Sequence, residues 1–270
     1  MGNVKSKYLV KYTISAAGDR MDLLHSLVRD LVHGNFQAPV EEGLQKGIKV
    51  LDAGCGVGKW TLEMARDYPF SQFTGTDISR LFPKSTNLSN CNFVLADTRK
   101  VLPFPDNTFD YVYQRFLTLS FTRKEWENVF NELVRVTKPG GWIECFEYDF
   151  ELHRPGPRSK QILAELGKLK EVQVFGSERL DRFANFLENV QRDDIMLSYG
   201  WNGKIGDALA YGWQLQMLAM KTRLTAQTDW SEDEFELLVS QALAEFPEQR
   251  TWGKMPYVYG QKPALKSVDG

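Results

Sequence analysis

The chain has 270 residues, of which 43% are hydrophobic and 25% are charged, with a formal net charge of −2. Such a chain can bury a full core as one large domain or as a domain with a cap. The near-neutral charge gives no overall attraction to nucleic acid, and no apolar run approaches the roughly 20 residues of a transmembrane helix. We therefore expect neither a nucleic-acid partner nor a membrane-spanning helix.

Three cysteines, Cys55, Cys91 and Cys145, are odd in number and widely spaced. They form no Cys-x-x-Cys pair and no cluster with histidine, so they favour neither a disulfide framework nor a zinc site. We expect reduced, mostly buried thiols in a cytoplasmic protein that binds no metal.

The chain begins Met1-Gly2-Asn3-Val4-Lys5-Ser6, which fits the pattern for N-myristoylation of Gly2. One myristoyl chain binds membranes only marginally, with a constant of about 10⁴ M⁻¹, so the positive charges of Lys5, Lys7 and Lys11 matter as a second attraction. The alternative is a flexible polar leader over residues 1–17. A membrane-associated or nuclear location therefore stays open beside the cytoplasmic one.

Residues 19–33 have helical periodicity, and Gly34 stands where a C-terminal cap belongs. The apolar face expected for this helix contains Met21, Leu24, Val28, Leu31 and Val32, with Leu27 beside it. We expect the helix to pack against a core domain that spans residues 18–150.

The stretch from Val50 to Lys59 joins an apolar run to an Asp-x-Gly-x-Gly-x-Gly motif and then to an amphipathic segment. This pattern predicts a buried strand, a glycine turn and the start of a helix over residues 58–67, where backbone N–H groups face a ligand. The motif residues are Asp52, Gly54, Gly56 and Gly58. Lys59 replaces the third glycine of a dinucleotide fingerprint, which argues against NAD, and the alternative is a tight turn that binds nothing.

Two further predicted strands end in an acid, at Asp77 and at Asp97. Asp77 lies 19 residues after Gly58, close to the spacing at which an acid accepts ribose hydroxyls in nucleotide-binding folds. The alternative is a surface turn aspartate. A fourth strand ends at Tyr113-Gln114-Arg115-Phe116.

With the glycine motif, the turn Leu102-Pro-Phe-Pro-Asp-Asn-Thr-Phe-Asp110 and the turn Lys138-Pro-Gly-Gly141, the chain resembles the class I S-adenosylmethionine-dependent methyltransferases. Within them it is similar to a fungal branch that includes regulators of secondary metabolism. The resemblance implies S-adenosylmethionine as cofactor, with Asp97 near the adenine amino group. The implied cofactor-binding residues are Asp52, Gly54, Gly56, Gly58, Asp77, Asp97 and Gln114.

Strands that alternate with helices predict an α/β fold, a doubly wound, mostly parallel Rossmann-like sheet of seven strands. Thr122-x-x-Glu125 predicts a capping box that opens a helix, and residues 142–148 predict the fifth strand. Residues 257–260 also look like a strand, and the resemblance implies that it closes the sheet in antiparallel orientation. Glu144, mid-strand in a buried sheet, must find a hydrogen-bond partner. Ligands bind beyond the carboxyl ends of such strands, where Asp52, Asp77, Asp97, Gln114 and Glu147 converge.

Beyond residue 150 helices predominate, near 158–171, 177–190, 205–222 and 231–247, with a short strand near 195–198. We expect residues 151–253 to form a helical cap with the last sheet elements, and residues 254–270 to form the closing strand and a tail.

The expected reaction is methyl transfer to a small-molecule oxygen or nitrogen acceptor, because the Asn/Asp-Pro-Pro-Tyr/Phe motif of many amino-directed enzymes is absent after the fourth strand. If a base is needed, His153 and Glu147 are the best placed residues, although His153 fits an ordinary loop histidine equally well. The alternative function is a non-catalytic S-adenosylmethionine-binding regulator or scaffold.

We expect protein made in a eukaryotic host to lack Met1 and to carry a myristoyl group on Gly2, because the leader fits the acylation pattern. Intact-mass analysis checks this, with Gly2→Ala as the control. An unmodified amino terminus in the wild-type protein would refute the assignment.

Overall fold

The computed structural model describes residues 17–168 and 176–264, so Gly2, Lys5, Lys7 and Lys11 lie outside the described residues. The chain divides into two compact units, each described here by itself. The first unit comprises the described parts of residues 1–31, 149–173 and 195–255, and the second comprises those of residues 32–148, 174–194 and 256–270.

A mostly parallel sheet forms the centre of the second unit. Its parallel strands are β1 (Lys49–Ala53), β2 (Gln72–Asp77), β3 (Cys91–Leu95), β4 (Phe109–Arg115) and β5 (Thr137–Phe146). They lie in the order β3-β2-β1-β4-β5, and β8 (Trp252–Gln261) pairs antiparallel with β5. The doubly wound topology and the antiparallel closing strand predicted from the sequence are confirmed.

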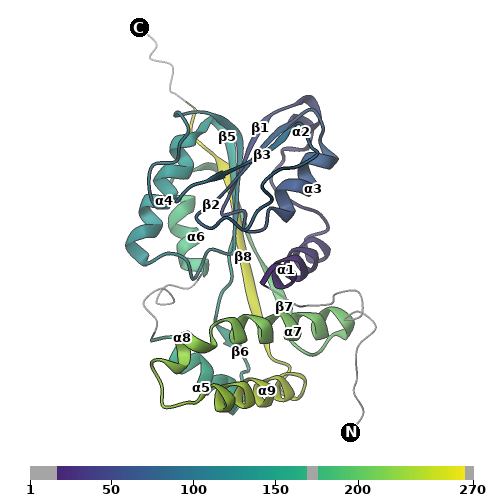
Figure 1. Cartoon of the computed structure of the whole chain (residues 1–270), viewed down its shortest axis with the longest axis vertical. Helices are drawn as coiled ribbons and strands as arrows, with labels where there is room; N and C mark the ends of the chain where they lie inside the picture. Colours follow the sequence, from purple (N-terminus) through teal and green to yellow (C-terminus); the bar gives the residue numbers. More distant parts are fainter. Residues whose placement is uncertain (1–16, 169–175, 265–270) are drawn as a thin grey trace. The chain divides into compact units, whose positions relative to one another are not determined.

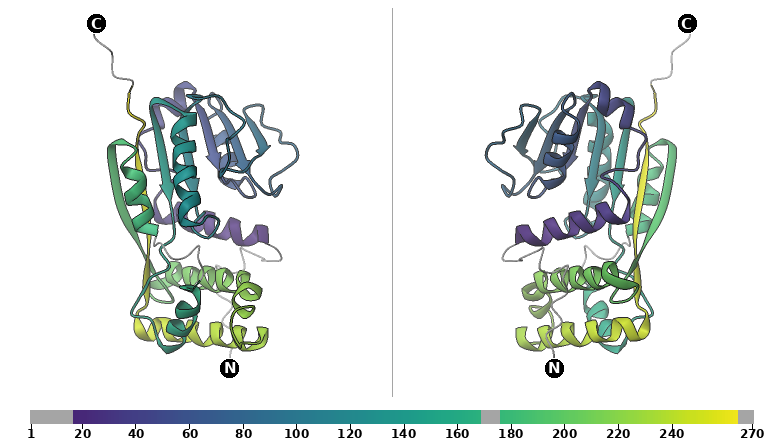
Figure 2. Two further views of the ribbon diagram at one scale, coloured as in Figure 1. Left: turned by 90° about the vertical axis from the view of Figure 1, so that its left-hand side faces the viewer. Right: turned by 90° about the vertical axis from the view of Figure 1, so that its right-hand side faces the viewer.

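Helices cover both faces of this sheet (Figures 1 and 2). On one face lie α4 (Arg123–Val136) and α6 (Gly176–Ala184), and on the other lies α3 (Lys59–Asp67), with the short α2 (Glu41–Lys46) on the same side. The predicted capping box opens α4, since Thr122 N donates to Glu125 Oε2 at 2.8 Å and Glu125 N donates to Thr122 Oγ1 at 3.4 Å. Residues of β1, β4, β5, α4 and α6 share one buried apolar core.

The first unit is mainly helical, with α1 (Ala17–Leu31), α5 (Pro157–Leu166), α7 (Gly203–Ala219), α8 (Lys221–Thr225) and α9 (Glu232–Gln249). Helix α9 packs against α5, α7 and α8, and α1 packs against α7. A two-residue strand, β6 (Leu152–His153), pairs with the start of β8. Strand β7 (Glu188–Ser198) also pairs with β8 and runs from the second unit into the first.

Several elements differ from the sequence expectations. Helix α1, expected in the core domain, belongs to the first unit, where it packs on α7, and Leu23, Leu27 and Val28 are its buried apolar residues. Helix α6, expected in the cap, belongs to the second unit because Leu180 and Phe183 are fully buried in the core of the sheet. The sheet has eight strands rather than seven, since β6 adds to it, and β7 is longer than expected. An apolar stripe on a helix does not specify which surface will cover it.

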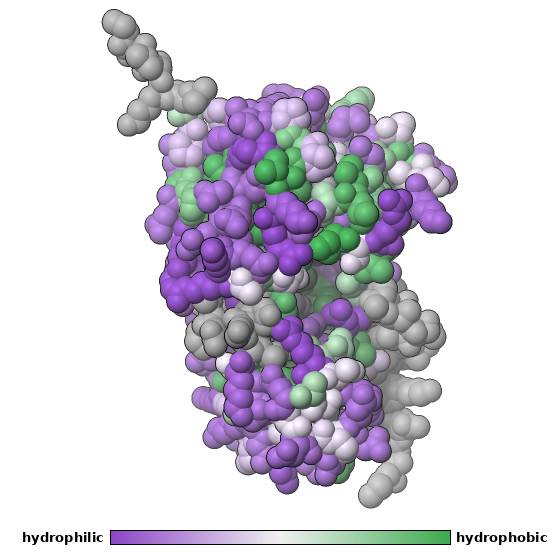
Figure 3. All heavy atoms as spheres, turned by 60° about the vertical axis from the view of Figure 1, so that its left-hand side comes forward, coloured by the Kyte–Doolittle hydropathy of each residue, from purple (hydrophilic) through white to green (hydrophobic). Residues whose placement is uncertain are grey.

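Hydrophilic residues predominate on the face of the molecule seen in Figure 3, and hydrophobic residues gather there in small patches. Among the described residues, no helix is both long enough and apolar enough to cross a membrane.

Glu144 lies at the centre of β5 with a fully buried carboxylate that finds hydrogen-bond partners, as its position in the sheet predicts. Its Oε1 accepts the N–H of Gln37 at 2.8 Å, and its Oε2 accepts the N–H of Ala38 and the hydroxyl of Tyr111, each at 2.8 Å. Burial raises the pKa of Glu144 from 4.5 to about 7, although these hydrogen bonds oppose the rise. The carboxylate thereby ties the segment before α2 to the sheet.

We expect the free energy of unfolding to fall as the pH rises from about 4.5 to about 7. In this window the folded protein holds a proton on Glu144 that the unfolded chain has released, so rising pH favours unfolding. Glu144→Gln, which cannot ionise, should show a smaller fall in urea unfolding measured across this pH range. The matched control is Glu248→Gln at an exposed position of α9. Identical pH dependence in wild type and Glu144→Gln would contradict the expectation.

Candidate functional site

The glycine turn lies between β1 and α3 and has left-handed backbone at three glycines. The φ angles are +79° at Gly54, +56° at Gly56 and +79° at Gly58, a region that residues with a side chain avoid. Gly54 N and Cys55 N both donate to the carbonyl oxygen of Thr76 at 2.8 Å. These bonds fix the turn to the neighbouring strand β2 near its carboxyl end.

Asp77, the last residue of β2, is hydrogen-bonded to the glycine turn. Its Oδ2 accepts the N–H of Gly56 at 2.9 Å and its Oδ1 accepts the N–H of Ser79 at 2.7 Å. The structure therefore brings Asp77 and the glycine motif together, as the sequence predicts. The next residue, Ile78, was not singled out from the sequence, yet it is a large apolar residue that is 57% exposed.

Asp52 is a buried residue of β1 that contacts α3, the helix after the glycine turn. The residue is only 3% exposed, and its Oδ2 accepts the Thr61 hydroxyl of α3 at 2.6 Å. Burial raises the pKa of Asp52 to about 6, and the hydrogen bond from Thr61 opposes that rise. This contact joins β1 to α3, so Asp52 positions the start of the helix that follows the glycines.

Asp97, expected near an adenine amino group, forms a two-pronged ion pair with Arg99. Arg99 Nε donates to Oδ1 at 2.9 Å and Nη2 donates to Oδ2 at 3.0 Å. The hydrogen bonds from Arg99 hold the pKa of Asp97 below its ordinary value. Arg99 also contacts Glu125 of α4 at 3.3 Å. A ligand amino group at Asp97 would share the Asp97 carboxylate with the Arg99 guanidinium. Arg99 was not predicted as a site residue from the sequence, although it stands only two residues after the acid.

Gln114 lies near the end of β4 with its side chain fully buried. Its register partners are Ala53 on β1 and Cys145 on β5. Neither Oε1 nor Nε2 has a hydrogen-bond partner among the described residues. A buried amide without partners costs free energy, so the Gln114 amide could bind a polar ligand group near the end of β1.

The loop after β4 covers the glycine turn. Phe116 has a φ of +60°, an unusual conformation for a bulky residue, and the Leu117 side chain lies so close to Gly54 that a Cβ there would be 2.6 Å from Leu117 Cδ1. Glu147 holds this loop, because its Oε1 accepts Leu117 N at 3.2 Å and its Oε2 accepts the Thr118 hydroxyl at 2.6 Å.

Glu147 is fully buried, and burial raises its pKa to about 7. Its two carboxylate oxygens both bind the loop, which makes Glu147 a positioning residue for Leu117. Its expected use as a base stays a prediction.

His153 lies in β6 of the first unit, where its ring stacks on Trp252 with centroids 3.8 Å apart. This contact gives His153 a packing role, and its role as a base also stays a prediction. Within residues 17–168 and 176–264, no three His, Cys, Asp or Glu side chains are arranged to hold a metal ion.

Residues 50–141 match the family model of a methyltransferase domain. The chain is also 30% identical over 156 residues to demethylmenaquinone methyltransferase from Staphylococcus aureus. That alignment covers 54% of this chain and 62% of the relative, so the chain spans less than two thirds of the length of the curated relatives it matches.

Two solved structures show how widely the fold is shared. The [4+2]-cyclase SpnF matches with a TM-score of 0.54 and 19% identity, over 92% of this chain and 95% of that one. Phosphoethanolamine N-methyltransferase 2 from Haemonchus contortus, in complex with S-adenosyl-L-methionine, matches with a TM-score of 0.52 and 16% identity, over 97% of this chain and 61% of that one. The sheet and its helices are therefore the Rossmann-like fold expected from the sequence.

We expect Gly54→Ala to destabilise the protein more than Gly140→Ala does. Both glycines have positive φ, +79° and +75°, so each substitution costs about 1–2 kcal/mol of backbone strain. Only at Gly54 does the added methyl group meet a neighbour, since nothing lies within 4 Å of a Cβ at Gly140. Urea unfolding measures the difference, and adding Leu117→Ala to Gly54→Ala should recover part of the excess. Equal losses in the two single variants would show that Leu117 does not pack on the turn as described.

Proposed function

We propose that this chain, whose residues 50–141 match the family model of a methyltransferase domain, is a class I methyltransferase that transfers a methyl group from S-adenosylmethionine to a small acceptor molecule. The observation that carries the proposal is the glycine turn held beside Asp77 at the carboxyl end of the sheet. Ligands of doubly wound sheets bind at this edge.

The residues at this edge fit the cofactor. The left-handed glycines let a ligand approach the backbone closely, and the half-buried carboxylate of Asp77 has lone pairs left for ribose hydroxyls. The buried Gln114 amide, which lacks partners among the described residues, would hydrogen-bond to the methionyl part or to the acceptor. Asp97, shared with Arg99, would accept from the adenine amino group.

S-adenosylmethionine supplies a methyl carbon that its sulfonium already activates. The chain therefore has to orient the acceptor in line with that carbon and keep water away. Leu117, which packs on Gly54, contributes an apolar wall to the turn, and Glu147 holds the loop that carries it. No residue needs to form a covalent intermediate.

We propose an oxygen or nitrogen atom of a small molecule as the acceptor. After β4 the chain has Tyr113-Gln114-Arg115-Phe116 in place of the motif of many amino-directed enzymes on nucleic acids and proteins. In the structure Phe116 stacks on Tyr148 with ring centroids 4.4 Å apart, and the Arg115 guanidinium lies 5.6 Å from the Phe116 ring. Such an aromatic pair at the ends of β4 and β5 suits a planar organic acceptor better than a polymer backbone.

Similarity to a methyltransferase does not by itself establish methyl transfer, because the [4+2]-cyclase SpnF has a similar fold. The alternative function is a non-catalytic regulator or scaffold that binds S-adenosylmethionine without turning it over. The narrower resemblance to fungal regulators of secondary metabolism stays a prediction of the same kind. Cofactor binding is common to both functions, and product formation separates them.

We expect calorimetric titration to show binding of S-adenosylmethionine and S-adenosylhomocysteine, and labelled methyl transfer to appear in a small-metabolite extract. Asp77→Asn should weaken binding about tenfold or more, because it removes the charge that strengthens hydrogen bonds to ribose hydroxyls. Gln114→Leu should also weaken binding, yet leave the free protein as stable or more stable, since it removes an unsatisfied buried amide.

The matched control for Gln114→Leu is Gln72→Leu at the exposed first residue of β2. Wild-type binding without transfer would favour the regulator. Absence of binding to either compound, or normal binding by Asp77→Asn, would overturn the assignment of the glycine turn.

A further inference from the structure

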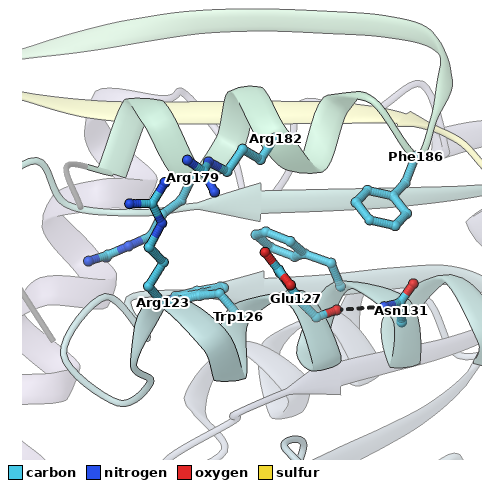
Figure 4. Close-up of a pocket in the computed structure, with 8 residues that line it drawn as sticks. Arg123, Trp126, Glu127, Asn131, Arg179, Arg182 and Phe186 are labelled. Carbon is cyan, nitrogen blue, oxygen red and sulfur yellow. Dashed lines mark hydrogen bonds between the residues drawn. The ribbon is translucent and has the colours of Figure 1, made fainter. Parts of the chain in front are cut away.

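A pocket lies in the second unit between α4 and α6, formed by residues other than those assigned to the cofactor (Figure 4). Its volume is about 250 Å³. This is somewhat smaller than the roughly 300–1,000 Å³ of sites for drug-sized ligands, so it suits a molecule of one or two rings.

Aromatic rings make up much of the pocket wall. Trp126 and Phe130 come from α4, and Phe186 follows α6. Phe130 is stacked on the core residue Phe183 with centroids 4.5 Å apart, so the ring it offers to the pocket is fixed in position. A planar apolar group here would pack on a ring that the core already holds in place.

Arginines occupy one end of the pocket, and Phe186 lies at the other end (Figure 4). The side chains of Arg123 and Arg182 are 61% and 40% exposed, and both contact the carboxylate of Glu178, at 3.8 Å and 2.8 Å. Two guanidinium groups thus share one exposed carboxylate, which an incoming anion could replace. Glu127 also lines the pocket and partly offsets the positive charge.

Arg179 is buried and has a structural role at the same end. Its guanidinium lies 5.5 Å from the centre of the Trp126 ring, and its Nη1 donates to the carbonyl oxygen of Thr118 at 3.1 Å. The positive charge of Arg179 remains close to the pocket wall while its side chain is held in place. It therefore adds to the field that an anion would meet.

Trp126 supplies an independent indication of a ligand. The residue is only 2% exposed, and its indole Nε1 has no hydrogen-bond partner among the described residues. A buried N–H group without an acceptor is rare and costs free energy, and an indole can only donate. An acceptor at this nitrogen would complete its hydrogen bonding, and an acceptor is also the type of group that the neighbouring arginines bind.

We propose that this pocket binds a small organic anion with a planar apolar body, such as an aromatic carboxylate. The carboxylate accepts from the Trp126 indole and from Arg123 and Arg182, and the ring system packs on Phe130 and Phe186. The inference concerns a site apart from the cofactor residues, so it does not depend on methyl transfer.

The test uses 1-naphthoate as the probe and 1-naphthamide as its neutral counterpart, with S-adenosylhomocysteine present in excess to fill the cofactor site. Indole N–H resonances in ¹H–¹⁵N spectra report the contact directly, and Trp126→Phe identifies the Trp126 signal while keeping an aromatic ring. We expect 1-naphthoate, and not 1-naphthamide, to shift that resonance.

Calorimetry with variants tests the charged end of the pocket. Arg123→Gln combined with Arg182→Gln should weaken 1-naphthoate binding about tenfold or more, because two charge-assisted hydrogen bonds are lost. Lys124→Gln removes one positive charge at an exposed position of the same helix outside the pocket, and it should leave the 1-naphthoate affinity unchanged. Circular dichroism confirms that every variant is folded.

Three results would overturn the proposal. They are an unshifted Trp126 resonance at saturating 1-naphthoate, equal binding of 1-naphthamide, and unchanged 1-naphthoate affinity in the folded double arginine variant. None of them bears on whether S-adenosylmethionine binds, so failure here and failure of the proposed methyl transfer are distinguishable.

Discussion

The left-handed backbone of the glycine turn is the constraint on which the site depends. The chain must leave β1 and enter α3 within a few residues, and it does so with positive φ at Gly54, Gly56 and Gly58. Side chains from other elements fill the space that a Cβ would need, since Leu117 lies over Gly54 and Phe93 lies over Gly58. The glycines therefore serve the close approach of neighbours within the protein as well as that of a ligand.

Buried carboxylates connect this edge of the sheet to the rest of the second unit. Asp52 holds Thr61 of α3, Glu144 holds the N–H groups of residues 37 and 38, and Glu147 holds the loop at residues 117 and 118. Burial raises the pKa of each of these groups, because a charge in a low-dielectric interior is poorly solvated. Their hydrogen bonds offset part of that cost, and the rise in pKa that remains makes the fold sensitive to pH.

Helix α4 serves two surfaces through different faces. Val129, Leu133 and Val136 pack into the core beneath the sheet, while Trp126 and Phe130 reach both that core and the pocket beside α6. Arg179 of α6 lines the pocket and binds Thr118, whose hydroxyl in turn binds Glu147. The wall of the pocket and the loop over the glycine turn are therefore parts of one hydrogen-bonded arrangement.

The sequence by itself predicted the elements whose causes are local. Strand, glycine turn and helix around Gly54, the acid at Asp77 and the capping box at Thr122 follow from residue types a few positions apart, and the structure contains each of them. The sequence also predicted that the carboxyl ends of the strands converge, because parallel strands with helical crossovers end at one edge of the sheet.

Contacts between residues distant in sequence were decided only by the tertiary structure. These contacts set the unit to which α1 and α6 belong, the attachment of Glu147 to the loop after β4, and the pocket between α4 and α6. The apolar stripe of α6 would suit a cap or a sheet equally well, and a buried glutamate suits a base or a support. What a side chain does depends on which surfaces meet, and local periodicity carries no information about that choice.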